Sequence, residues 1–301
     1  MIYQSENLSD VLDQVRSEFD FEVVKRPLVG SLNEGGETVP TDWFACFRDD
    51  NFEPVGPGSV KDGYVPHTTE DVVTLVEAAI DGFGKGVTEV KTDFHNGHFV
   101  LVSPSSEYQR EISGRDIVFP RLLIQAGLGG SSSFRCTLGL YRSLCSNLEI
   151  FRTHKSFSVS IRHTRHLPNR IDDLRQSFAG LQEGWTDLEG VIDRAHQRKV
   201  DIAEILDKIY PQPSETASSR STTIHRDRTR EIVSRLFRER DAGGYGLTET
   251  GKATAWELFN AVQGYQLHDA IQRGKRSDLQ RAILANNTPQ VRKAEELLLA
   301  A

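Results

Sequence analysis

The apolar positions near the start of the chain follow first a helical and then a strand spacing. Residues Leu8 to Glu18 place apolar side chains three or four positions apart, which predicts a short amphipathic helix. Phe21 to Val29 and Asp42 to Arg48 are rich in β-branched and aromatic residues, and predict two strands. The polar, glycine-rich Ser31 to Thr38 separates them, and Pro54 to Gly63 has the composition of a loop.

A helix and a hairpin follow. Thr68 is placed to cap a helix, and Asp71, three positions on, can complete a capping box. Glycines end this helix. Asn96-Gly97 then separates two apolar runs within residues 87–103, and this dipeptide tolerates the positive φ angles of a tight β-hairpin turn.

The next hundred residues predict more strands than helices. Ile117 to Gln125, Phe134 to Leu140 and Ser156 to Thr164 have strand patterns, with a short helix or loop around Ser143 to Ile150. Too few helices alternate with these strands for a parallel sheet. We therefore expect an α+β fold, with an antiparallel sheet packed on helices in the N-terminal half and a mostly helical C-terminal half.

From Pro168 onward the apolar spacing is helical. Further helices are predicted at residues 226–240, 253–272 and 288–299, the last with Pro289 in its first turn. The Pro/Ser-rich run before them has the composition of a mobile linker. The predicted organisation is a mixed α+β domain with a basic strand surface (1–167), a long helical segment (168–210), a flexible linker (211–223) and a helical C-terminal region (224–301).

Charge is unevenly distributed along the 301 residues. The chain has a formal net charge of −7, but Arg121 to Arg175 contains nine Lys/Arg and three Asp/Glu, a local charge of +6. The remainder therefore has a charge of −13, and this asymmetry indicates a surface for an anionic partner.

The cysteine content, the N-terminal sequence and the length of the apolar runs indicate the compartment in which the protein is expected. Three cysteines are too few for a disulfide framework, and the N-terminus lacks the pattern of a secretion signal, so we expect reduced thiols and a cytoplasmic protein. No apolar run is long enough to span a bilayer, so no membrane partner is expected.

The sequence contains no convincing motif for phosphate binding, zinc binding or nucleophilic catalysis. Gly127-Leu-Gly-Gly is not followed by Lys-Ser/Thr or a helix, as a phosphate loop requires. Three histidines and two cysteines suggest zinc, but their spacing matches no common ligand pair; they are His154, His163, His166, Cys136 and Cys145. No nucleophile motif or carboxylate pair stands out, so neither an enzyme, a metal nor a cofactor is expected.

The basic residues are the strongest candidates for a binding site. On Ser156 to Thr164, strand alternation directs Phe157, Val159 and Ile161 inward, and the serines with Arg162 outward. Hydroxyl and guanidinium groups donate hydrogen bonds to phosphate oxygens, and aromatic rings stack on bases. The predicted nucleic-acid-binding residues are Arg135, Arg142, Arg152, Lys155, Arg162, Arg165, Tyr141 and Phe151. A solvated face, or arginines in a subunit contact, is an equal alternative.

Four segments of the chain carry a family resemblance. They are Lys25-Arg-Pro-Leu28, Arg142-Ser-Leu-Cys-Ser-Asn147, Ile161-Arg-His-Thr164 and Thr254-Ala-Trp-Glu-Leu-Phe-Asn-Ala-Val-Gln-Gly-Tyr265. Together they resemble the phage/plasmid-like protein family, long listed as a domain of unknown function, and more distantly phage single-strand annealing proteins. The resemblance implies a mobile-element protein and supplies no catalytic residues. The helix around Trp256 is expected to be a buried packing helix.

These observations lead to one expected function and two alternatives. We expect a mobile-element-associated protein that binds single-stranded DNA as a homo-oligomer, with a role in strand annealing or DNA recombination. A protein-interaction module, for assembly or for inhibition of host defence, would bind no nucleic acid. An enzyme with a dispersed active site would show a deep pocket with convergent titratable residues.

Overall fold

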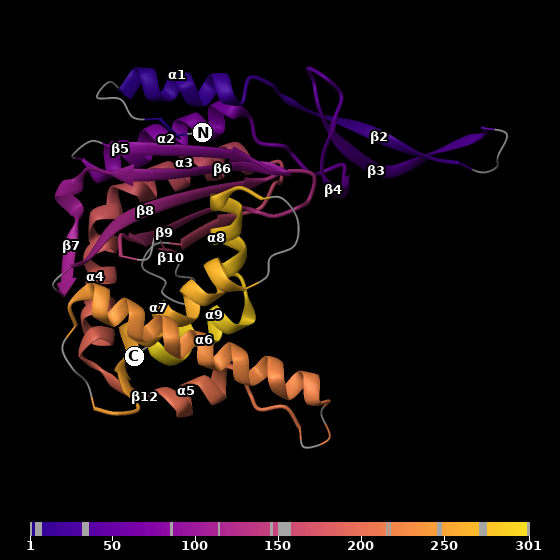
Figure 1. The fold of residues 1–301 in the computed structure, drawn as a ribbon. Helices are drawn as coiled ribbons and strands as arrows, with labels where there is room; N and C mark the ends of the chain where they lie inside the picture. The colour runs from indigo at the N-terminus through magenta and orange to yellow at the C-terminus, as the bar shows by residue number, and fades with distance from the viewer. Residues whose placement is uncertain are drawn as a thin grey trace. The chain divides into compact units, whose positions relative to one another are not determined.

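The computed structural model describes residues 2–3, 8–31, 36–84, 87–113, 115–144, 147–149, 158–214, 216, 218–245, 249–270 and 276–299 (Figure 1). The chain divides into two compact units. The first comprises residues 1–107, 121–138 and 157–182, and the second comprises residues 108–120, 139–156 and 183–301. The predicted boundary near residue 167 does not coincide with this division, because residues 157–182 belong to the first unit.

Strands of the first unit form an antiparallel sheet. They are β1 (Ile2–Tyr3), β5 (Val87–Phe94), β6 (Gly97–Pro104), β8 (Asp116–Gly127), β9 (Phe134–Arg142) and β11 (Ser158–Ile161). The pairs β1–β5, β5–β6, β6–β8 and β9–β11 are all antiparallel. By sequence, β8 and β9 each continue into the second unit.

Three helices pack against this part of the sheet: α1 (Leu8–Glu18), α2 (Thr69–Phe83) and α3 (Leu167–Ser177). Helix α2 contacts β6, α1 contacts β5 and α3 contacts β11, so one sheet face is covered (Figure 1). The buried side of α2 includes Val72, Leu75, Val76 and Ala79, none of which is measurably exposed. The core of the first unit therefore lies between α2 and the sheet.

The ends of α2 confirm the predicted signals. The Thr68 hydroxyl accepts the Asp71 backbone N–H at 3.1 Å, and the Asp71 carboxylate accepts the Thr68 N–H at 2.8 Å. This capping box satisfies two backbone donors that the helix itself cannot pair. Gly84, with φ 72°, ends the helix in the left-handed conformation.

The predicted hairpin is also present. Phe94 pairs with His98, which leaves a three-residue connection in which Asn96 has φ 54° and Gly97 has φ 152°. Both residue types tolerate positive φ more readily than others, which is why this dipeptide marked the turn.

A separate three-stranded sheet contains β2 (Val23–Ser31), β3 (Thr38–Arg48) and β4 (Pro54–Lys61), in that order. The far end of the β2–β3 ribbon extends away from the helices and sheet of the first unit (Figure 1). The Gly/Pro-rich segment predicted as a loop is in fact β4, whose backbone pairs with Trp43, Phe44, Cys46 and Phe47 of β3. Pairing with β3 and burial of Val55 and Val60 outweigh its weak strand propensity.

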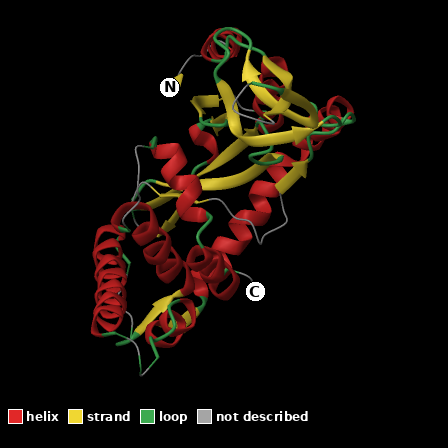
Figure 2. Ribbon diagram, turned by 90° about the vertical axis from the view of Figure 1, so that its right-hand side faces the viewer, coloured by secondary structure: helices red, strands yellow, loops and turns green. Residues whose placement is uncertain are grey.

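Most of the second unit is helical (Figure 2). Its helices are α4 (Leu181–Gln197, whose first two residues belong to the first unit), α5 (Ile202–Ile209), α6 (Ser219–Gly243), α7 (Ala255–Gly264), α8 (Asp278–Asn286) and α9 (Pro289–Leu298). A π-helical turn, Tyr265–Asp269, follows α7. Strand β7 (Arg110–Ser113) pairs with β8, β10 (Asn147–Glu149) with β9, and β12 (Lys199–Asp201) with β13 (Lys252–Thr254).

The structure confirms the α+β fold and corrects several boundaries. The predicted long helical segment is α3, a 3-10 turn at Phe178–Gly180, α4, β12 and α5. Helix α6 begins at Ser219, inside the predicted linker, because Ser218 caps it by accepting the Ser221 N–H. Residues 147–149 form β10 instead of a helix or loop, and α8 was not predicted.

Among the described residues, no helix combines the length and apolarity that a membrane span requires.

A substitution at Gly97 tests the backbone geometry of the β5–β6 hairpin. A Cβ there would meet the Ala126 carbonyl in a backbone conformation that L-residues rarely adopt. We expect Gly97→Ala to lower the free energy of unfolding by more than about 1 kcal/mol, as measured by urea denaturation. Gly58→Ala is the matched control, because a Cβ at Gly58 meets nothing within 4 Å. Equal stability of the two variants would contradict the assignment.

Candidate functional site

Strands β9 and β11 bring polar and basic side chains to one sheet face. Ser160 pairs with Arg135 and Ser158 with Thr137, so these four residues point to the same side. The Ser133 and Ser160 hydroxyls lie 2.7 Å apart. Ser158, Ser160 and Arg162 are exposed, whereas Arg135 is half-buried. The predicted outward row on β11 is therefore present over its described residues.

The same segment remains basic into α3. Arg165, His166 and Arg170 are exposed, and the Arg165 Nε donates to the His166 Nε2 at 3.3 Å. Across the described parts of the chain, neither Arg135, Arg162, Arg165 nor Arg170 has a carboxylate partner within salt-bridge distance. We call Arg135, Arg162 and Arg165, with Ser158 and Ser160, the strand face. Guanidinium groups without a carboxylate partner are suited to bind an anion.

Arg142 does not belong to this face, which corrects the prediction. Its side chain is 1 % exposed, and it points with Phe134, Cys136 and Leu140 into the buried side of β9. Its Nε and Nη2 each donate to Asp116 at 2.8 Å, and its Nη1 donates to Glu239 at 2.6 Å. An arginine so enclosed cannot reach a phosphate without unfolding its surroundings.

Of the remaining predicted residues, the structure describes only Tyr141. Tyr141 is half-buried on β9, in the part of that strand assigned to the second unit. Arg152, Lys155 and Phe151 lie outside the described residues, as do His154, Cys145, Ser156 and Phe157. Of the predicted set, Arg135 lies on β9 opposite Ser160, Arg162 directly follows β11, and Arg165 lies in the turn before α3.

Asp116 is the centre of a buried polar cluster in the second unit. Besides Arg142, it accepts hydrogen bonds from the Tyr245 hydroxyl and from the Trp256 Nε1, the latter at 3.3 Å. Burial raises the pKa of Tyr245 above its ordinary value, so the hydroxyl remains a donor. Asp116 and Trp256 are fully buried, which confirms that the Trp256 helix is a packing helix. We interpret this cluster as structural.

Three histidines form a second buried cluster, in the first unit. His67 Nδ1 lies 3.0 Å from His163 Nε2, and His67 Nε2 lies 2.8 Å from His98 Nδ1. Burial lowers the pKa of His98 to about 3 and that of His163 to about 4, and holds that of His67 well below its ordinary value. The rings are therefore neutral at pH 7, and each donates or accepts according to its tautomer.

The histidine cluster could be found only in part from the sequence. Strand alternation after Ile161 directs His163 inward, but His67 and His98 are distant in sequence and carry no local signal. Within the described ranges, no three His, Cys, Asp or Glu side chains are arranged to hold a metal ion. Cys136 is buried, which raises the pKa of its thiol, and a neutral thiol is a poor nucleophile.

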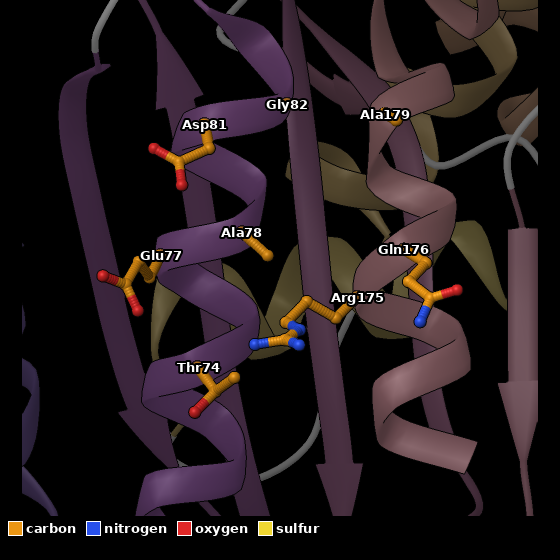
Figure 3. Close-up of a pocket in the computed structure, with 8 residues that line it drawn as sticks. All are labelled: Thr74, Glu77, Ala78, Asp81, Gly82, Arg175, Gln176 and Ala179. Atoms are coloured by element: carbon orange, nitrogen blue, oxygen red, sulfur yellow. The ribbon is translucent and has the colours of Figure 1, made fainter. Parts of the chain in front are cut away.

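A groove of about 410 Å³ lies between α2 and α3. Arg175 reaches from α3 towards α2, whereas the Glu77 and Asp81 carboxylates point away from it (Figure 3). These titratable groups do not converge on a common point. The groove therefore lacks the arrangement that acid–base catalysis requires.

The buried histidines predict a pH-dependent stability. Because each folded-state pKa lies below the unfolded value of about 6.5, the unfolded chain binds more protons, and stability falls as pH decreases from 6.5 towards 4. We expect His163→Gln to reduce this slope by up to about 1.4 kcal/mol per pH unit. The measurement is urea unfolding at several pH values. His166→Gln, on an exposed ring, is the control, and an unchanged slope in His163→Gln would refute the assignment.

Because Asp116 and Arg142 form a buried ion pair, we expect substitutions of the two residues to have non-additive effects on the free energy of unfolding. We expect Arg142→Leu to lower the free energy of unfolding by about 3–5 kcal/mol, because it leaves a buried carboxylate unpaired. The double variant Asp116→Leu/Arg142→Leu should lose less than the sum of the single variants. Additive losses in denaturant titrations would show that the pair is not coupled.

Comparison with known proteins identifies one family. The model of the family described as "Domain of unknown function (DUF932)" matches residues 57–288, more than half of the chain. Searches of curated proteins and of solved structures returned no match. The comparisons return no enzyme family, and nothing in them connects the chain to phage or annealing proteins. The chain thus belongs to the DUF932 family.

Proposed function

We propose that this protein binds single-stranded DNA through the strand face. The supporting observation is that Arg135, Arg162 and Arg165 have no carboxylate partner among the described residues, and that Arg135 pairs with the exposed Ser160 while Arg162 and Arg165 follow it in the chain. Such donors contact phosphate oxygens of any sequence, so we expect affinity without strong base preference.

The proposal includes assembly into a homo-oligomer. The strand face of one chain offers few phosphate contacts, and an acidic chain of net charge −7 gains from aligning several such faces along one strand. From the family resemblance of its motifs, we further propose a role for the oligomer in strand annealing or recombination on mobile elements.

The central test is the salt dependence of binding, measured by fluorescence anisotropy with a labelled single-stranded oligonucleotide. We expect binding at low salt and a steep loss of affinity with added salt. Each phosphate contact contributes about −0.7 to the log–log slope for single strands. The variant Arg135→Ala/Arg162→Ala/Arg165→Ala should therefore reduce the slope by about 2.

A matched control removes the same charge elsewhere. Lys208→Ala/Arg281→Ala/Lys293→Ala changes three half-exposed side chains on α5, α8 and α9, and should leave the slope unchanged. Light scattering with and without the oligonucleotide reports the oligomeric state. Absence of binding at low salt ends the proposal, whereas equal slopes for the two triple variants would show that the strand face is not the site.

One observation favours the alternative of a protein-interaction module. The three-stranded sheet exposes Val29, Val39 and Trp43 by 42–60 %, and the turn between β3 and β4 exposes Phe52 by 65 %. Apolar side chains so exposed are frequent at protein–protein contacts. This alternative predicts a stable protein partner in a pulldown and no oligonucleotide affinity.

A further inference from the structure

Helix α6 consists of two halves that differ in burial. Its buried residues are Ile232, Leu236, Arg240 and Gly243, all in the C-terminal half. Every residue from Ser219 to Glu231 is exposed or half-buried, and the first turns reach beyond α7 and α9 (Figure 1). The outer half, Ser219–Arg230, thus lacks the apolar packing that normally stabilises a helix in a protein.

The two halves also differ in how their arginines are paired. In the inner half, three arginines each meet a carboxylate: Arg235 meets Glu239 and Asp269, Arg238 meets Glu231, and Arg240 meets Glu257. The inner half, Glu231–Gly243, has three arginines and three acidic residues and is neutral. Its three arginines are therefore paired within the protein.

Among the described residues, the arginines of the outer half are paired with carboxylates much less than those of the inner half. The outer half has four arginines and one aspartate, a net charge of +3. Among the described residues, Arg220 and Arg230 have no carboxylate partner, and Arg226 approaches only its exposed neighbour Asp227, at 3.5 Å. Arg228 lies over the Tyr210 ring, 5.2 Å from its centre.

The charge arrangement of the outer half opposes helix stability. No acidic residue lies in the first turn, which instead contains Arg220 near the positive end of the helix dipole. Arg226 and Arg230 are like charges four positions apart, an arrangement that costs about 0.2–0.5 kcal/mol. A bound polyanion would remove both penalties, so the arrangement suits an anionic ligand.

We propose that the outer half of α6 is a binding site for double-stranded DNA. A helix with its side chains is about 10–12 Å across, close to the roughly 12 Å width of the major groove. Because residues Ser219–Ile224 are exposed on every side, this end can enter a groove, which a helix packed along one face cannot do as deeply. Arg220, Arg226 and Arg230 then contact phosphates on the groove walls.

This site is independent of the function proposed above. It uses other residues, on another element, and takes a duplex instead of a single strand. The contacts are to phosphates, so affinity depends strongly on salt and weakly on sequence.

The test compares triple variants of the full chain on a labelled duplex. Each phosphate contact contributes about −0.9 to the log–log salt slope for duplex DNA. We expect Arg220→Ala/Arg226→Ala/Arg230→Ala to reduce the slope by about 2 to 3, and to weaken binding at least about tenfold at physiological salt. The corresponding triple lysine variant should retain the slope, because it retains the charge.

Two controls make the outcomes distinct. The variant Lys208→Ala/Arg281→Ala/Lys293→Ala has the same charge change and should bind duplex like the wild type. The triple alanine variant of the strand face should retain duplex binding and lose only single-strand binding. The proposal is overturned if the wild type fails to bind duplex at low salt, or if the α6 alanine and control variants have equal slopes. Circular dichroism confirms that each variant is folded.

Discussion

The buried ion pair between Asp116 and Arg142 is the interaction on which the second unit depends. Removing two charges from water costs several kcal/mol per ion, and the cost is offset only where the geometry satisfies the remaining hydrogen-bonding groups. Here Arg142 also meets Glu239 of α6, and Asp116 also meets Tyr245 and Trp256. One carboxylate therefore connects β8, β9, α7 and the segment after α6, so a shift of any of these elements breaks at least one hydrogen bond to a buried charge.

The same ion pair explains why two of the segments that carry the family resemblance contain an arginine and a tryptophan. Arg142 begins one of the segments that carry the family resemblance, and Trp256 lies within another, although 114 positions separate them. Both side chains contact Asp116. Arg142, which suggested phosphate binding when considered along the chain, is required here by packing, because its guanidinium fork satisfies part of a buried carboxylate, as does the Trp256 indole N–H.

The elements that the sequence predicts well are those determined by neighbouring residues. The capping box of α2 and the Asn96-Gly97 turn involve residues three or fewer positions apart. Strand β4 and the histidine cluster depend instead on contacts between distant segments, which a Gly/Pro-rich composition or a single histidine does not reveal. The burial of Arg142 was accessible in principle, because alternation from Phe134 places it on the apolar side of β9, opposite Arg135.

Net charge is a poor guide to what a surface of this protein can bind. Charges on a surface are screened over about 8–10 Å at physiological salt, so a distant carboxylate does little to an exposed arginine. Whether an exposed arginine can bind an anion depends on whether a carboxylate of the protein lies beside that arginine. Acidic residues of α6, α7 and the π-helical turn lie beside Arg235, Arg238 and Arg240, whereas among the described residues Arg220 and Arg230 have no carboxylate beside them. An acidic chain can thus present basic sites, provided that its carboxylates neutralise arginines elsewhere.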